Sequence, residues 1–468
     1  MGWRRLLLVG ALCALAAAAG AWSRGIYAAR VAVDEPQYLL SALSIAEDGD
    51  LDISDELAAQ RWRAFHEGPL PEQTQPLPGG RRVSPHDPLL PLLLALPMAT
   101  GGWLAAKLTL AVLAGALGAA TAWVAARRFD VPGGIASLAA VVFGASVPLA
   151  SYGNQVYPEL PAALAVVIAV GALTGPFRRG GVWALGATVV ALPWLAVKYT
   201  PVAAALAVCG LAQLWRRSRG AAVGLAGGLA AAGIVFLAIH QAVYTGWTAY
   251  AAGDFFYSEG GFAFGRVFGL RPDYWARSQR LVGLLVGRKF GIAAWQPAWL
   301  LAVPALAALA RARPAGWHVL AALIVVGWLN ATFVALTAQG YWVPGRQVVV
   351  ILGCAVIAVA WWAARVGAAR LLIILGLVGV ASYLWLAVET SVGPLRLIID
   401  WFKTTNPFYR AWRWALPDYI VPTAWTWTLH GLWTAALIGL LALGWRQGRD
   451  PGLAPEGSLW RRWTQRVS

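Results

Sequence analysis

Long apolar runs recur along almost the whole chain, and they restrict the possible fold more than any other feature. Runs of about 20 apolar residues suit helices that cross a bilayer, because a helix satisfies its own backbone hydrogen bonds in the hydrocarbon. Of the 468 residues, 59% are hydrophobic and 12% are charged, whereas a soluble domain carries about 25% charged residues. The sequence therefore predicts an all-α polytopic membrane protein.

Arginine clusters such as Arg127–Arg128 and Arg178–Arg179 separate these apolar runs. Short cationic loops stay in the cytoplasm, so the clusters assign alternate connections to the inside. The net charge of +16 is thus spread over short connections between spans. A nucleic-acid-binding protein would carry a basic domain outside the spans, and we expect no nucleic-acid partner.

The apolar runs and the arginine loops together predict about 12 transmembrane helices in one integral domain, 1–468, of an inner or plasma membrane. Both termini are expected in the cytoplasm, with residues 446–468 as a tail. Residues 1–22 contain the first span, 6–22, but they also resemble a secretory signal, so retention and cleavage both stay open. The acidic first outer loop, 23–102, includes a helix expected at the membrane surface at 89–99. The other spans, within 103–445, are predicted at 103–126, 133–152, 160–175, 181–196, 200–215, 222–243, 291–310, 316–337, 347–364, 371–388 and 425–445.

Acidic residues gather in the first outer loop, where the segment 23–88 holds 11 of the 21 Asp and Glu residues. A membrane protein that concentrates carboxylates beside one face of the bilayer is expected to carry out its chemistry there. The 11 acidic residues are Asp34, Glu35, Glu47, Asp48, Asp50, Asp52, Asp55, Glu56, Glu67, Glu72 and Asp87.

Asp34 and Glu35 are the candidate catalytic residues of this loop. Pro36 fits the first turn of a helix that we expect to continue through Leu51. Partial desolvation at the membrane boundary raises the basicity of a carboxylate, which favours a general base there. Adjacent residues of a helix point about 100° apart, so one carboxylate would act while the other orients it. A purely structural role at the positive end of the helix dipole is the alternative.

The segment from Asp34 to Tyr38, Asp-Glu-Pro-Gln-Tyr, followed by Gly49-Asp50, resembles the opening of the first outer loop in GT-C glycosyltransferases. This group includes the lipid A aminoarabinose transferases and the protein O-mannosyltransferases, multi-span enzymes that use polyprenyl-phosphate sugars on the extracytoplasmic face. The resemblance covers residues 1–160 and, more loosely, the later pattern of spans. It implies a GT-C-like bundle with Asp34 as the base, Tyr38 at the substrate, a polyprenyl-phosphate sugar donor, and a glycolipid, envelope glycan or protein as acceptor.

His86 and Asp87 stand where the family has a Pro-Pro-Leu segment, often after a lysine. His86 is a candidate hydrogen-bond donor to the donor phosphate, and a turn-and-cap role is the alternative. Tyr157 and Glu159 mark the outer end of the span 160–175. The family has a second acidic residue on a similar loop, so Glu159 would orient the acceptor or position Asp34. A glutamate at a helix start is also favourable without any function.

Lys198 and Arg346 are the candidate cations for the polyprenyl phosphate that leaves in such a reaction, because developing negative charge needs positive partners. Lys198 lies at the expected outer tip of the hairpin formed by 181–196 and 200–215. A lysine near a span end also reaches the interface without any functional role. Arg346 follows Gly340-Tyr341-Trp342-Val343-Pro344-Gly345, which resembles a stretch before a late span in the family.

No cofactor is expected to be required. Asp48-Gly49-Asp50-Leu51-Asp52 offers oxygen ligands to a divalent cation but lacks the full calcium-loop pattern, so a metal remains an alternative. Two other functions stay open, a transporter or flippase for lipid-linked sugars and a non-catalytic protein with the GT-C fold. Transporters usually show internal repeats, and none is evident here. The oligomeric state is not predicted.

Overall fold

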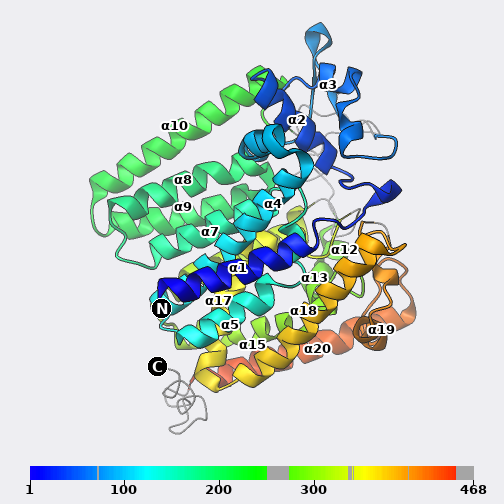
Figure 1. Cartoon of the computed structure of the whole chain (residues 1–468). Helices are drawn as coiled ribbons and strands as arrows, with labels where there is room; N and C mark the ends of the chain where they lie inside the picture. Colours follow the sequence, from blue (N-terminus) through cyan, green and yellow to red (C-terminus); the bar gives the residue numbers. More distant parts are fainter. Residues whose placement is uncertain (71–72, 250–272, 336–339, 341, 399, 450–468) are drawn as a thin grey trace.

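The computed structural model describes residues 1–70, 73–249, 273–335, 340, 342–398 and 400–449. Within them the chain forms a bundle of helices (Figure 1), which confirms the predicted all-α class. The two described strands, β1 (Gln75–Pro76) and β2 (Arg82–Val83), pair antiparallel as a short ribbon in the first loop.

Seven described helical segments are long and apolar enough to cross a membrane. They are α4 (Leu89–Arg128), Val197–Trp215 with α9 (Thr200–Trp215), α10 (Arg219–Tyr244), Trp317–Val334 with α16 (Trp317–Leu329), α17 (Val349–Val366), α18 (Ala369–Val392) and α20 (Ala424–Gln447). Three further apolar segments are shorter: α5 (Gly133–Gly144), α7 (Glu159–Leu173) and Pro297–Ala312. Helices α1 (Trp3–Ala19) and α8 (Arg179–Leu195) have 17 residues each. Each of the 12 predicted spans therefore contains a helix, but only seven described segments have full spanning length.

Two spans predicted as continuous helices are broken, and both breaks contain a proline. Span 133–152 divides into α5 and α6 (Leu149–Tyr152), with Pro148 between them. Span 291–310 divides into α14 (Ile292–Trp295), the 3-10 helix Pro297–Leu301 and α15 (Ala302–Ala312). Proline lacks the N–H that continues a helix and clashes with the preceding turn, so the continuous predictions were wrong at these positions.

Several predicted boundaries also differ from the structure. The surface helix expected at 89–99 is the first arm of α4, which breaks at Gly102, where φ is 63° and ψ is −158°. Glycine tolerates this backbone conformation because it has no Cβ. Helix α2 (Glu35–Glu47) ends before Leu51, and the segment predicted at 316–337 ends at Val334. The predicted tail falls mostly on 450–468, outside the described residues.

The remaining described helices are short. Most lie in the loops between the long ones, and Val197–Tyr199 and Asn330–Val334 are end turns of two of the long segments named above. The short helices are Ile26–Ala28, α3 (Ser54–Ala58), Arg61–Ala64, Pro78–Gly80, Val197–Tyr199, α12 (Tyr274–Ser278), α13 (Arg280–Val286), Asn330–Val334, Trp401–Lys403, α19 (Pro407–Trp412) and Arg413–Ala415.

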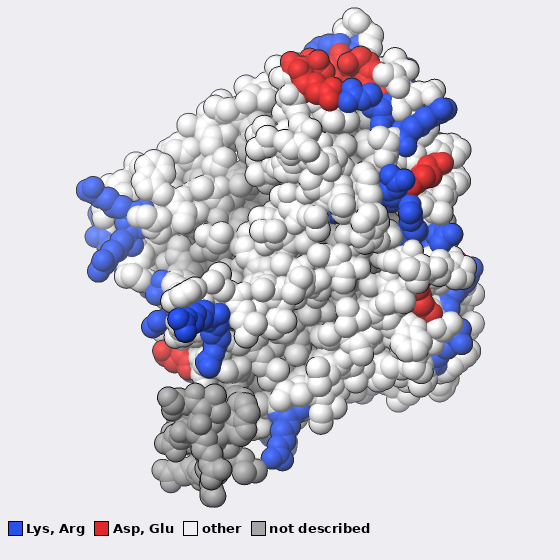
Figure 2. Space-filling model, in the orientation of Figure 1, with Lys and Arg blue, Asp and Glu red and all other residues white. Residues whose placement is uncertain are grey.

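Helix α17 forms the centre of the bundle, because most of its residues are buried and it packs against α4, α5, α7, α15 and α16. Helix α2 packs on α4, and α7 packs on both α4 and α17. The N-terminal ends of α2, α7 and α17 are therefore brought close to one another. The acidic patch over α2 and α3 lies far from the arginines at the other ends of α8, α9 and α10 (Figure 2).

Candidate functional site

Four of the predicted site residues form one chain of ion pairs. The guanidinium of Arg346 donates to Asp34 Oδ2 at 2.8 Å and to Glu159 Oε1 at 3.0 Å. Lys198 Nζ donates to the same Glu159 oxygen at 2.6 Å. Asp34 precedes α2, Glu159 begins α7, Lys198 precedes α9 and Arg346 precedes α17. Residues up to 312 positions apart thus meet in a network of two carboxylates and two cations.

The network is largely shielded from solvent. The side chain of Glu159 is 0% exposed, and those of Asp34 and Arg346 are each 11% exposed. Ion pairs in such surroundings depend on one another, because an unpaired charge cannot recover its lost hydration. Burial raises the pKa of Asp34, but the nearby Arg346 guanidinium outweighs it and holds that pKa below its ordinary value. Asp34 is therefore a carboxylate at neutral pH.

Three predicted aromatic residues line the network. The Arg346 guanidinium lies 4.4 Å from the ring centre of Tyr157, in a cation–π contact. The ring of Tyr38 stacks on His86 with 4.4 Å between centroids and lies 6.3 Å from that of Tyr157. Burial lowers the pKa of His86 to about 4, so its imidazole is neutral at pH 7. The motif residues of the first loop therefore share one site with Tyr157.

Glu35, the first residue of α2, has a different set of partners from Asp34. Its two oxygens accept hydrogen bonds from the backbone N–H groups of Ala32 and Val156, each at 2.8 Å. Glu35 is 3% exposed, and burial raises its pKa. The side chain ties the first loop to the segment before α7, which is a positioning contact.

Two ionisable residues inside predicted spans support this site, and the sequence analysis missed both. His240 Nε2 lies 3.1 Å from Asp87 Oδ1, and Asp87 Oδ2 accepts from the backbone N–H of Val197, beside Lys198. Lys107 Nζ donates to the backbone oxygen of Arg30 at 2.6 Å. A lone charged or titratable residue within an apolar run is a signal of function, and this signal was available in the sequence.

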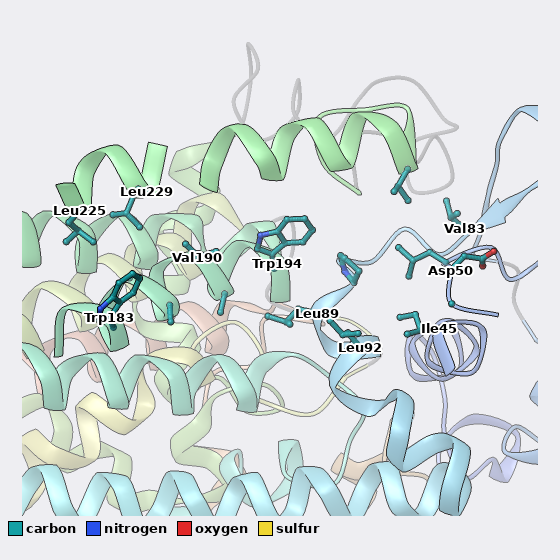
Figure 3. A pocket seen from close by; sticks show the side chains of 18 of the residues that line it. Ile45, Asp50, Val83, Leu89, Leu92, Trp183, Val190, Trp194, Leu225 and Leu229 are labelled. Atoms are coloured by element: carbon teal, nitrogen blue, oxygen red, sulfur yellow. The ribbon is translucent and has the colours of Figure 1, made fainter. Parts of the chain in front are cut away.

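A groove of about 1190 Å³ runs between α8, α10 and the first arm of α4 (Figure 3). Its walls are mostly apolar, with Trp183 and Trp194 from α8 and Leu225 and Leu229 from α10. Asp34 is not among the lining residues. Pro88 and Leu89 line the groove directly after His86 and Asp87 in the chain, so the groove reaches the segment of the first loop that carries His86.

No family profile and no curated protein matches the sequence. Among solved structures, the chain is similar to ArnT from Cupriavidus metallidurans bound to undecaprenyl phosphate, with a TM-score of 0.53 and 14% sequence identity. The match covers 96% of this chain and 76% of that one. The chain has the GT-C fold. An identity of 14% establishes the architecture and not the specific family.

Proposed function

We propose that this GT-C protein is a membrane glycosyltransferase that transfers a sugar from a polyprenyl-phosphate donor to an extracytoplasmic acceptor. The observation that carries the proposal is the Asp34–Arg346–Glu159–Lys198 network, and the same first loop that carries Asp34 also lines a large apolar groove. A carboxylate base, cations for a phosphate and an apolar channel for a lipid are the three parts that such a reaction needs.

Lys198 and Arg346 would bind the phosphate of the donor. A polyprenyl-phosphate sugar carries one negative charge, and its phosphate gains a second as the bond to the sugar breaks. Charge-assisted hydrogen bonds from a guanidinium and an ammonium stabilise that added charge within a shielded site. Glu159 would hold both cations in position, since one of its oxygens already accepts from each of them.

Asp34 would accept the proton of the acceptor hydroxyl or amine. The freed electron pair attacks the anomeric carbon, and the bond from that carbon to the phosphate oxygen breaks on the opposite side, so the configuration inverts. Without substrate, Arg346 holds Asp34 in an ion pair. A donor phosphate that competes for Arg346 would weaken this pair and raise the pKa of Asp34, which makes it a better base when the donor is present.

The groove would hold the prenyl tail of the donor. Its apolar walls of α8 and α10 suit a hydrocarbon chain, and the protein of similar fold was solved with undecaprenyl phosphate. The arginine-rich connections are expected to face the cytoplasm, so the network would lie on the extracytoplasmic side of the inner membrane.

The purified protein in nanodiscs, given a panel of radiolabelled polyprenyl-phosphate sugars and an envelope lipid extract as acceptor, tests this proposal. We expect transfer of label from one member of the panel, with release of one free polyprenyl phosphate for each sugar transferred. Movement of intact donor across proteoliposomes, without cleavage of its sugar–phosphate bond, would indicate the flippase alternative.

A further inference from the structure

The acidic tip of the first loop contains a group of carboxylates outside the ionic network (Figure 2). Two members of the Asp48–Asp52 stretch are occupied by local hydrogen bonds. Asp50 Oδ1 accepts from the Ser44 hydroxyl and from the backbone N–H of Asp52, both at 2.9 Å. Asp52 Oδ1 accepts from the backbone N–H groups of Ser54 and Arg82. These two aspartates stabilise the turn.

Three other carboxylates converge at the same tip. One oxygen each from Asp48, Asp55 and Glu56 lies within 4.8 Å of the other two. Asp48 and Asp55 are exposed, but Glu56 is only 1% exposed. Both Glu56 oxygens are buried and make no hydrogen bond of ordinary geometry within the described residues.

A charged carboxylate that is buried beside two others is unfavourable, because it has lost its water and lies next to like charge. The nearby cation Arg61 forms no hydrogen bond to these three carboxylates, since it donates two hydrogen bonds of 2.8 Å to Glu47 instead. A bound cation would compensate all three carboxylates at once. Oxygen-only ligands and exposed positions for water are typical of calcium and magnesium sites.

We propose that Asp48, Asp55 and Glu56 bind one divalent cation of the calcium type. Ca²⁺ binds oxygens at about 2.3–2.6 Å, so two of its ligands can lie up to about 5 Å apart, whereas Mg²⁺ allows roughly 4.2 Å. The three oxygens lie within 4.8 Å of one another, close enough to bind one Ca²⁺ together. Gly49, Asp50 and Leu51 line the apolar groove, so the cation would also fix the outer wall of that groove.

Calcium binding to the full-length protein, purified in detergent and stripped with EDTA, tests the proposal without any assay of activity. Isothermal titration with CaCl₂ should give one site per chain with a Kd of about 10⁻⁴–10⁻³ M, the range of extracellular modules. Glu56→Gln should weaken binding at least tenfold and remove the calcium-dependent rise in melting temperature. Glu47→Gln removes the same charge from the same loop but no proposed ligand, and it should bind calcium within about threefold of wild type.

Asp48→Asn provides a second test if Glu56→Gln does not fold, because Asp48 is exposed and its substitution leaves the loop interior unchanged. It should also lose at least tenfold in calcium affinity. Absence of saturable binding up to 10 mM CaCl₂ (about ten times the weakest expected Kd) would overturn the proposal. Wild-type affinity in either ligand variant would overturn it as well, whatever the outcome for sugar transfer.

Discussion

Arg346→Met is the substitution that examines the ionic network most closely. Arg346 donates one hydrogen bond to each of two carboxylates and is only 11% exposed. Hydrogen bonds to charged groups contribute about 1.5–3 kcal/mol each, so the two together are worth roughly 3–6 kcal/mol. Removal of one partner from a buried ion pair costs about 3–5 kcal/mol. We therefore expect the free energy of unfolding to fall by about 4 kcal/mol.

The assay is equilibrium unfolding by SDS titration in mixed micelles, followed by tryptophan fluorescence. Arg61→Met is the matched control, because Arg61 forms a comparable double contact with Glu47 but is 43% exposed, and such pairs contribute about 0–1 kcal/mol. The double variant Asp34→Asn, Arg346→Met removes the charge of Asp34 that Arg346→Met alone leaves unpaired. Its loss in free energy of unfolding should therefore be about 1–3 kcal/mol smaller than the sum of the losses in the two single variants. Strictly additive effects, or an Arg346→Met cost no larger than that of Arg61→Met, would refute the reasoning.

Two further predictions concern catalysis and the groove. The acid side of the kcat/KM profile reports groups of the free enzyme. Arg346 holds the pKa of Asp34 below its ordinary value and burial lowers that of His86 to about 4, so neither of these two groups should produce a break between pH 7 and 5. A break near pH 6.5 would show a histidine of ordinary pKa. Gly228→Phe adds a ring to the groove wall at a position with open space around it, and it should raise KM for a long-chain donor at least fivefold, as steady-state kinetics would measure. Gly233→Phe, on the same helix but outside the groove, should leave KM unchanged.

The polar site was largely predictable from the positions of its residues at the expected outer ends of apolar runs. Asp34, Glu159, Lys198 and Arg346 were each singled out by that position, and the structure brings all four together. Their pairing was not predictable, since it depends on how α2, α7 and α17 pack. Their catalytic roles remain predictions.

The misses have two physical causes. The breaks near Pro148 and Pro297 were present in the sequence as prolines, but overall apolarity outweighed them in the assignment of spans. Lys107 and His240 were overlooked because the surrounding residues are apolar, and their partners come from distant parts of the chain. The convergence of Glu56 with Asp48 depends on the fold of the loop, which spacing along the chain does not reveal.

The activity of Asp34→Asn tests the central claim most directly. The measurement is release of polyprenyl phosphate from the cognate radiolabelled donor, with Glu47→Gln as a variant that removes an exposed carboxylate of the same loop. If Asp34 is the base, Asp34→Asn should lose at least 10²-fold in kcat, the lower bound of a general-base contribution of about 10²–10⁴, while Glu47→Gln keeps wild-type turnover. Wild-type turnover by a folded Asp34→Asn protein would contradict the proposed chemistry.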